Sequence, residues 1–197
     1  MPHSTRKVVA NIVLSLDGRT TGPAGPFDMG WIVPHAITDA ARDGLLRITD
    51  GTTAVLGRNN YQGFGSWWPA VAEDGSADPR DRRFAQWLDE VEKVVFSTTL
   101  TEATWRNSRI VSGDPATVVR DLRGQDGGDI WVLASQSVIR QLLDAGEVDR
   151  LSINLAPELV GGGDRLFGDG LPASSWSLTD LTASDSGAIW LIYDRKR

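Results

Sequence analysis

The sequence predicts an α/β fold whose central sheet is mostly parallel and ends in an antiparallel hairpin. Three apolar runs stop at small or hydroxylated residues and pass into segments of helical character, at 55–60, 94–99 and 130–137. This alternation is typical of a parallel sheet covered by helices. The chain ends differently, because segments 176–182 and 188–193 flank a short turn and predict a hairpin.

The N-terminal part combines one buried strand with a long loop. Residues 8–14 are apolar except for Asn11, and no cleavage-type site follows them, so they predict a first strand rather than a signal peptide. Segment 18–34 holds four glycines and three prolines and cannot form a regular element. A loop of this length is usually functional, and Phe27 and Trp31 argue against disorder, so we expect a lid over a binding site.

The next third of the chain predicts two helices separated by a strand and a loop. A helix is expected at 38–46, a strand at 52–56 and an irregular stretch at 60–78. Asp78-Pro79 is a typical helix start, because the aspartate can cap the helix and proline suits its first turn. The apolar residues that follow have helical spacing and are Phe84, Trp87, Leu88 and Val91.

The second half continues the alternation. Strands are expected at 94–97, 108–111 and 130–133; one helix starts at Asp114-Pro115, and another covers 136–145. The run at 130–133 is continuously apolar, which predicts a strand covered on both faces. Apolar and polar residues alternate at 151–155, which predicts a half-buried strand.

Composition indicates a globular protein that acts on small molecules. The 197 residues suit one α/β domain, and the net charge of −6 disfavours nucleic acid or an anionic membrane as the main partner. No run approaches the about 20 apolar residues of a membrane span. The chain has no cysteine and only two histidines, so thiolate or zinc chemistry and a Ser–His–Asp triad are disfavoured and no metal is expected.

Six motifs occur in series along nearly the whole chain. They cover residues 15–19, 56–61, 95–100, 129–138, 141–151 and 157–167. In this order they resemble the dihydrofolate reductase-like superfamily, most closely the stand-alone relatives of the reductase domain of the riboflavin-biosynthesis deaminase-reductase. The resemblance implies a three-layer dihydrofolate reductase-like fold, a single domain over 1–197 and pairing as a homodimer.

The resemblance also implies NADPH, bound in extended form across the strand ends, as hydride donor to a pteridine- or pyrimidine-like ring. It assigns three groups of residues to the cofactor. The phosphates would be contacted by Gly57, Arg58, Asn59 and Asn60, and the adenosine end by Ser97, Thr98 and Thr99. The pyrophosphate would be contacted by Ala134, Ser135, Gln136, Ser137 and Val138. A helix N-terminus suits the pyrophosphate because its free amides and dipole favour anions.

Simpler structural roles compete with several of these assignments. Ser135 could be a helix N-cap, and Arg58 a solvated charge, although a guanidinium beside hydroxyls suits a 2′-phosphate. Relatives often have glycine where Ala134 stands, so its methyl group could narrow the approach of the cofactor. The glycines at 161–163 favour a strand-end turn over ligand contact.

Reduction of a C=N or C=O bond also needs a proton, and two carboxyl groups are candidates for its source. Asp39 lies near the position of the acid in dihydrofolate reductases, with Asp43 close by, but it could equally be a first-turn helix residue. Asp17, in the turn after the first strand, is the second candidate and could be structural. A water molecule held by the substrate is the alternative to both.

Aromatic residues in irregular segments are candidates for the substrate site. Trp31 and Trp68, with Trp67 beside it, could stack on a heterocycle, and a dimer contact is the competing role. The sequence therefore predicts a cytoplasmic, homodimeric, NADPH-dependent reductase of a small pteridine- or pyrimidine-like heterocycle. A reductase of another carbonyl or imine, or a non-catalytic nucleotide-binding homologue, stays open.

Overall fold

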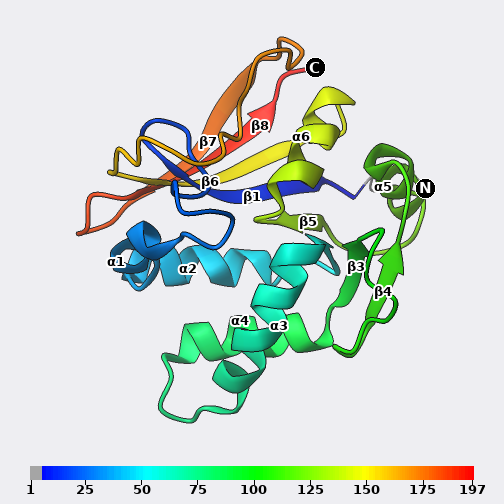
Figure 1. Ribbon diagram of the computed structural model, residues 1–197, viewed down its shortest axis with the longest axis horizontal. Coiled ribbons are helices and arrows are strands. Elements are labelled where there is room, and N and C mark those ends of the chain that lie inside the picture. Colours follow the sequence, from blue (N-terminus) through cyan, green and yellow to red (C-terminus); the bar gives the residue numbers. More distant parts are fainter. Residues whose placement is uncertain (1–5) are drawn as a thin grey trace.

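A computed structural model, which describes residues 6–197, contains one eight-stranded sheet flanked by helices (Figure 1). The strands lie in the order β4-β3-β2-β5-β1-β6-β8-β7. Their bounds are β1 Val8–Ser15, β2 Thr53–Gly57, β3 Glu92–Phe96, β4 Ser108–Val111, β5 Ile130–Leu133, β6 Arg150–Ala156, β7 Trp176–Ala183 and β8 Ile189–Arg195.

The first six strands are parallel, whereas β8 pairs antiparallel with both β6 and β7. This arrangement confirms the predicted mostly parallel sheet with a C-terminal antiparallel hairpin. Because β5 lies between β1 and β2, the segments that leave these three strands start side by side at one edge of the sheet.

Helices cover both faces of the sheet, so the fold has three layers. One buried cluster joins alternate residues of β1 to α5 and α6, and a second joins the opposite face to α2, α3 and α4. The helix bounds are α1 Val33–Ala36, α2 Asp39–Ile48, α3 Arg58–Glu73, α4 Pro79–Glu90, α5 Pro115–Arg123 and α6 Gln136–Asp144, with a short 3-10 turn, η1, at Gly30–Ile32. No helix of the described part of the chain is long and apolar enough to cross a membrane.

The irregular stretch expected at 60–78 is wrong, because α3 occupies most of it. Tyr61, Phe64 and Trp68 recur at helical spacing and pack into the cluster beneath the sheet. Trp68 lies edge-on against Phe84 of α4, with ring centroids 4.8 Å apart. This packing outweighs the helix-breaking tendency of Pro69, which stands inside the helix.

Strand β6 is not half-buried as its alternating sequence predicts. Ser152 and Asn154 are both buried, because the polar residues of the strand face a second packed layer rather than solvent. The Ser152 hydroxyl accepts hydrogen bonds from the side chains of Asn11 and Trp190, at 3.2 and 3.0 Å. Internal partners therefore replace water for the Ser152 hydroxyl.

Lys93 at the start of β3 is fully buried and closes the C-terminal end of α4. Its ammonium donates to the backbone oxygens of Leu88 and Val91, at 2.6 and 2.9 Å, and lies 4.8 Å from the centre of the Trp105 ring. Burial lowers the pKa of Lys93 to about 8, so the group still carries its proton at neutral pH. It satisfies helix carbonyls that no water reaches.

We predict that Lys93→Met destabilises the protein by about 1–3 kcal/mol at pH 7, because buried carbonyl groups lose their donor. Urea denaturation measures the loss. Lys7→Met is the matched control: Lys7 is half-exposed and makes one surface ion pair of 3.4 Å with Asp194, so its removal should cost within about 0.5 kcal/mol. Equal stability of the Lys93 variant and wild type would contradict this structural role.

Candidate active site

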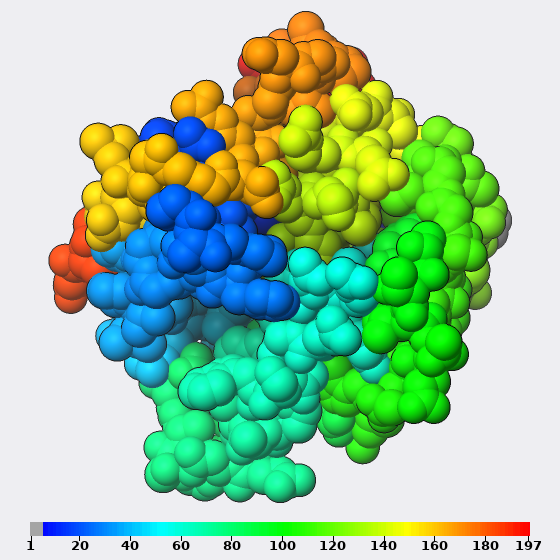
Figure 2. Space-filling view, viewed as in Figure 1, coloured from blue at the N-terminus to red at the C-terminus, as the bar shows by residue number. Residues whose placement is uncertain are grey.

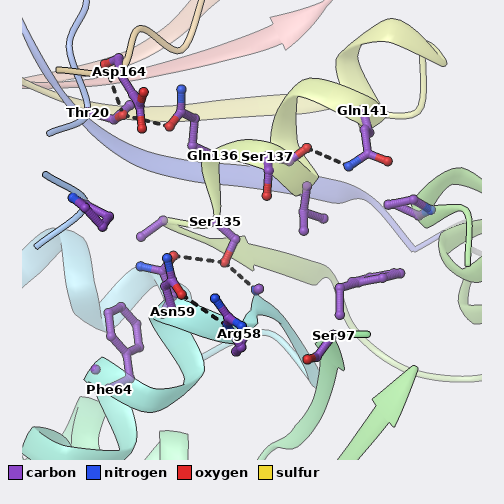
Figure 3. A pocket seen from close by; sticks show the side chains of 18 of the residues that line it. Thr20, Arg58, Asn59, Phe64, Ser97, Ser135, Gln136, Ser137, Gln141 and Asp164 are labelled. Carbon is purple, nitrogen blue, oxygen red and sulfur yellow. Dashed lines mark hydrogen bonds between the residues drawn. The ribbon is translucent and has the colours of Figure 1, made fainter. Parts of the chain in front are cut away.

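A cavity of about 810 Å³ lies at the carboxyl ends of the parallel strands (Figure 3). Segments following β2, β3 and β5 form its floor, and part of the lid, residues 18–34, forms one side. All twelve residues that the resemblance assigns to the cofactor line this cavity, namely Gly57, Arg58, Asn59, Asn60, Ser97, Thr98, Thr99, Ala134, Ser135, Gln136, Ser137 and Val138. The structure thus brings them together; their contact with a cofactor stays a prediction.

Two helices, α3 and α6, begin in the cavity without a side-chain cap. Neither Gly57 nor Ser135, at the two N-cap positions, makes a side-chain capping bond. By contrast, α2, α4 and α5 are capped by Thr38, Asp78 and Asp114. Uncapped N-terminal amides carry the positive end of the helix dipole, so the cavity floor suits an anion.

The Ser135 hydroxyl connects the ends of two strands instead of capping its own helix. It accepts a hydrogen bond from the Gly57 amide at 2.7 Å and donates to the Leu133 carbonyl at 2.7 Å. Ser135 is almost completely buried. Its side chain is therefore a structural bridge and not the N-cap weighed from the sequence, and its contact with a cofactor stays a prediction. Ser137, two residues further on, is exposed and also lines the cavity.

Ala134 adopts the left-handed conformation, with φ of 51°. A side chain disfavours this conformation, which glycine adopts without strain. The bend turns the chain from β5 into α6. Glycine would meet this backbone requirement without strain, and alanine meets it at some conformational cost.

Arg58 lies beside a hydroxyl group, as expected of a phosphate site. Its guanidinium donates to the Thr99 hydroxyl at 2.8 Å, and both residues belong to the cavity lining. The Ser97 hydroxyl accepts hydrogen bonds from the amides of Thr99 and Leu100, at 3.1 and 2.9 Å. Ser97 therefore shapes the loop that presents Thr99 to Arg58.

The base of the lid is attached to the loop that follows β6. The Thr20 amide donates to the Asp164 carbonyl at 2.8 Å, and the Asp164 amide donates to the Thr21 hydroxyl at 3.0 Å. A Cβ atom on Gly163 would lie 2.1 Å from the Thr21 carbonyl, so only glycine permits this approach. Figure 2 shows the blue lid segment against the yellow-orange segment that follows β6.

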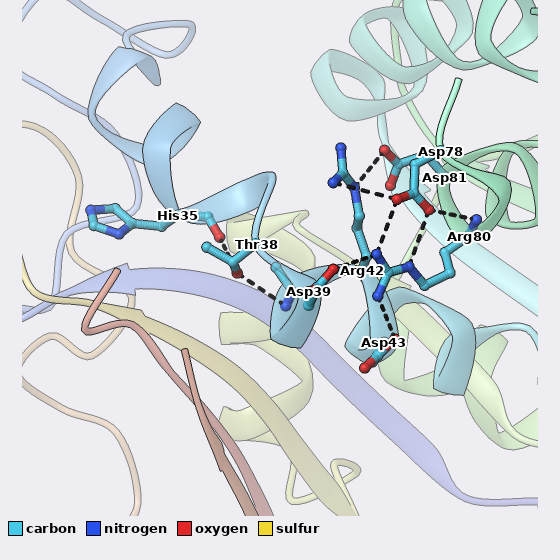
Figure 4. Close-up of polar contacts among 9 residues, drawn as sticks. His35, Thr38, Asp39, Arg42, Asp43, Asp78, Arg80 and Asp81 are labelled. Atoms are coloured by element: carbon cyan, nitrogen blue, oxygen red, sulfur yellow. Dashed lines mark hydrogen bonds and ion pairs between the residues drawn. The ribbon is translucent and has the colours of Figure 1, made fainter. Parts of the chain in front are cut away.

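Neither carboxyl group proposed as a proton source lines the cavity. Asp39 is exposed on α2 and forms an ion pair with Arg80, which also pairs with Asp43 (Figure 4). Asp17 accepts hydrogen bonds from the Ser15 hydroxyl at 2.6 Å and from the amides of residues 160 and 161. The Ser15 hydroxyl bond, with these amides, lowers the pKa of Asp17 well below its usual range, so it stays ionised. Both groups have structural roles here.

The aromatic side chains of the cavity differ from those expected. Trp31 and Trp68 do not line it. Trp31 lies in η1, and Trp68 packs against Phe84 of α4. The aromatic lining residues are Phe27, Phe64 and Phe96. The periodicity of α3 could have identified Phe64, but the glycines and proline around it obscured that signal. Trp67 is largely exposed, and the homodimer stays a prediction.

Comparison with known proteins gives relatives that extend over nearly the whole chain. The uncharacterized protein YyaP of Bacillus subtilis (strain 168) is 23% identical over 189 residues, covering 95% of this chain and 94% of YyaP. A putative riboflavin biosynthesis protein from Shewanella sp. PV-4 has a similar fold, with a TM-score of 0.71, 21% identity and coverage of 97% and 99% of the two chains.

Two further structures share the fold at lower identity. A pyrimidine reductase-like protein from Corynebacterium diphtheriae has a TM-score of 0.60 at 17% identity, over 100% of this chain and 96% of its own. A diaminohydroxyphosphoribosylaminopyrimidine deaminase/5-amino-6-(5-phosphoribosylamino)uracil reductase from Thermotoga maritima has a TM-score of 0.65 at 14% identity, over 98% of this chain and 57% of its own. Residues 6–190 match the family model of the RibD C-terminal domain, and the chain therefore belongs to the RibD C-terminal domain family.

Proposed function

We propose that the protein is an NADPH-dependent reductase of a small pyrimidine- or pteridine-like heterocycle. The observation that carries the proposal is the pair of uncapped helix N-termini that open into one cavity, with Arg58 and Thr99 beside them. This donor set suits a ligand with several separated phosphate groups. Family membership supports reductase chemistry within that cavity.

The chain offers two phosphate-binding positions. The first-turn amides of α6, at Gln136 and Ser137, would hold the pyrophosphate, and Arg58 with Thr99 would hold the 2′-phosphate. When bound, NADPH supplies a hydride. The chain's own contribution is to orient the two rings and to exclude water between β1 and the lid.

The substrate class is supported by the descriptions of two related structures and by the apolar lining of the cavity. The Corynebacterium protein is described as pyrimidine reductase-like, and the Thermotoga protein as a deaminase and uracil-derivative reductase. In this chain Ile12, Met29 and Phe64 add apolar lining, to which a flat heterocycle could bind. The substrate would thus lie between the end of β1, the lid and α3.

A nucleotide-binding protein without turnover is a second candidate, because neither Asp17 nor Asp39 lines the cavity. NADPH titration followed by a screen of pyrimidine and pteridine acceptors separates the two functions. We expect saturable binding and loss of nicotinamide absorbance with at least one acceptor. Binding without turnover of any acceptor would favour the second candidate, and absence of binding would exclude both.

We predict that Ser137→Asp weakens NADPH binding at least tenfold, because the new carboxylate would face the pyrophosphate at the N-terminus of α6. The same carboxylate should leave the free protein as stable as wild type or slightly more stable. Ser137→Asn, of similar size and without charge, is the matched control and should bind within about threefold of wild type. Fluorescence titration measures both affinities, and equal binding by the Asp variant would place the phosphates elsewhere.

We predict that Arg58→Ala costs NADPH on the order of 1.5–3 kcal/mol of binding free energy, about one to two decades in affinity, and leaves NADH nearly unchanged. NADH lacks the 2′-phosphate that the guanidinium would contact. The variant should also reduce the salt dependence of NADPH binding. Parallel titrations with both cofactors measure the difference; equal losses would assign Arg58 to the pyrophosphate or to the fold.

A further inference from the structure

The cavity has only two charged lining residues within the described part of the chain, and they lie on opposite sides. Arg58 is at the start of α3, and Asp164 is in the loop after β6. Figure 3 shows Asp164 with Thr20 and Gln136 on one side and Arg58 with Ser97 on the other. The cavity therefore has a cationic side and an anionic side.

The polar groups around Asp164 are hydrogen-bonded to one another or to the backbone. The Thr20 hydroxyl lies 3.1 Å from the Gln136 side-chain oxygen, and the Gln136 side-chain nitrogen donates to the Arg165 carbonyl at 2.7 Å. The backbone of Asp164 binds Thr20 and Thr21. Among residues 6–197 no group donates to the Asp164 carboxylate, so its oxygens are available to a ligand.

Two arginines lie near this carboxylate, but neither lines the cavity. The Arg19 guanidinium pairs with Asp17 at 3.3 Å and donates to the Gly163 carbonyl at 2.6 Å. Arg165 is exposed and does not line the cavity. Within the described lining, the lid side of the cavity therefore carries the Asp164 carboxylate and no cation.

We infer that the substrate carries no phosphate group and presents N–H or O–H donors to Asp164, which sets this preference. The inference rests on the proposed function: if Arg58 binds the 2′-phosphate and the first-turn amides of α6 bind the pyrophosphate of the cofactor, no other cation of the described lining is left for a substrate phosphate. A phosphate group on the substrate would also face the Asp164 carboxylate, and repulsion between the two negative charges is an effective source of specificity. The substrate thus differs from the phosphoribosyl compound named for the Thermotoga protein.

The test compares matched ligands on the protein saturated with NADPH. Calorimetry measures the affinities of cytidine and uridine against those of their 5′-monophosphates. We expect both nucleosides to bind and each monophosphate to bind at least tenfold more weakly. Asp164→Asn should reduce this ratio at least threefold, and Asp164→Lys should reverse the preference.

Arg165→Gln is the matched control, because it removes a neighbouring charge outside the cavity lining and should leave the ratio unchanged. The inference would be overturned if neither nucleoside bound, or if a monophosphate bound as tightly as its nucleoside or more tightly. It would also be overturned if the affinity ratio stayed the same in the Asp164 variants. Nicotinamide fluorescence measures NADPH binding first. Absence of that binding would refute the proposed function, whereas a wrong ratio with NADPH bound would refute the inference alone.

Discussion

The hydrogen bonds of one buried hydroxyl group, that of Ser135, hold the site together. This hydroxyl accepts a hydrogen bond from the amide of Gly57, which precedes α3, and donates one to the carbonyl of Leu133, at the end of β5. Both helices therefore begin at the cavity, and residues of their first turns line it. Held in this way, Ser135 does not cap its own helix, so the first amides of α6 have no side-chain partner there.

Packing elsewhere offsets the cost of this arrangement. Two buried clusters fix the faces of the sheet, and left-handed Ala134 turns the chain between β5 and α6. The strain of one left-handed alanine is on the order of 1–2 kcal/mol, small beside the burial of several large apolar side chains. The sheet edge and the left-handed turn at Ala134 together form one side of the cavity, and the lid contributes the other side.

Sequence patterns located the cavity floor better than its walls. Floor residues follow strands directly, so their position depends only on strand order and on where each strand stops, as at Arg58 and Thr99. The walls depend on tertiary contacts. Trp68 was expected in an irregular segment because Pro69 hid the helical pattern of α3. Asp164 was not singled out within the motif at 157–167, because it meets the lid through contacts with residues more than 140 positions earlier.

By itself the sequence determined the alternation of strands and helices and the C-terminal hairpin, because apolar periodicity and turn residues act over short distances. The family resemblance of its motifs added the segments that line the cavity. Only the tertiary structure decided which polar groups are free. The Ser135 hydroxyl and the Asp17 carboxylate bind hydroxyl and backbone groups of the protein itself, whereas no group of residues 6–197 donates to the Asp164 carboxylate. Hydrogen-bond partners distant in the chain settle that question, and no local pattern encodes them.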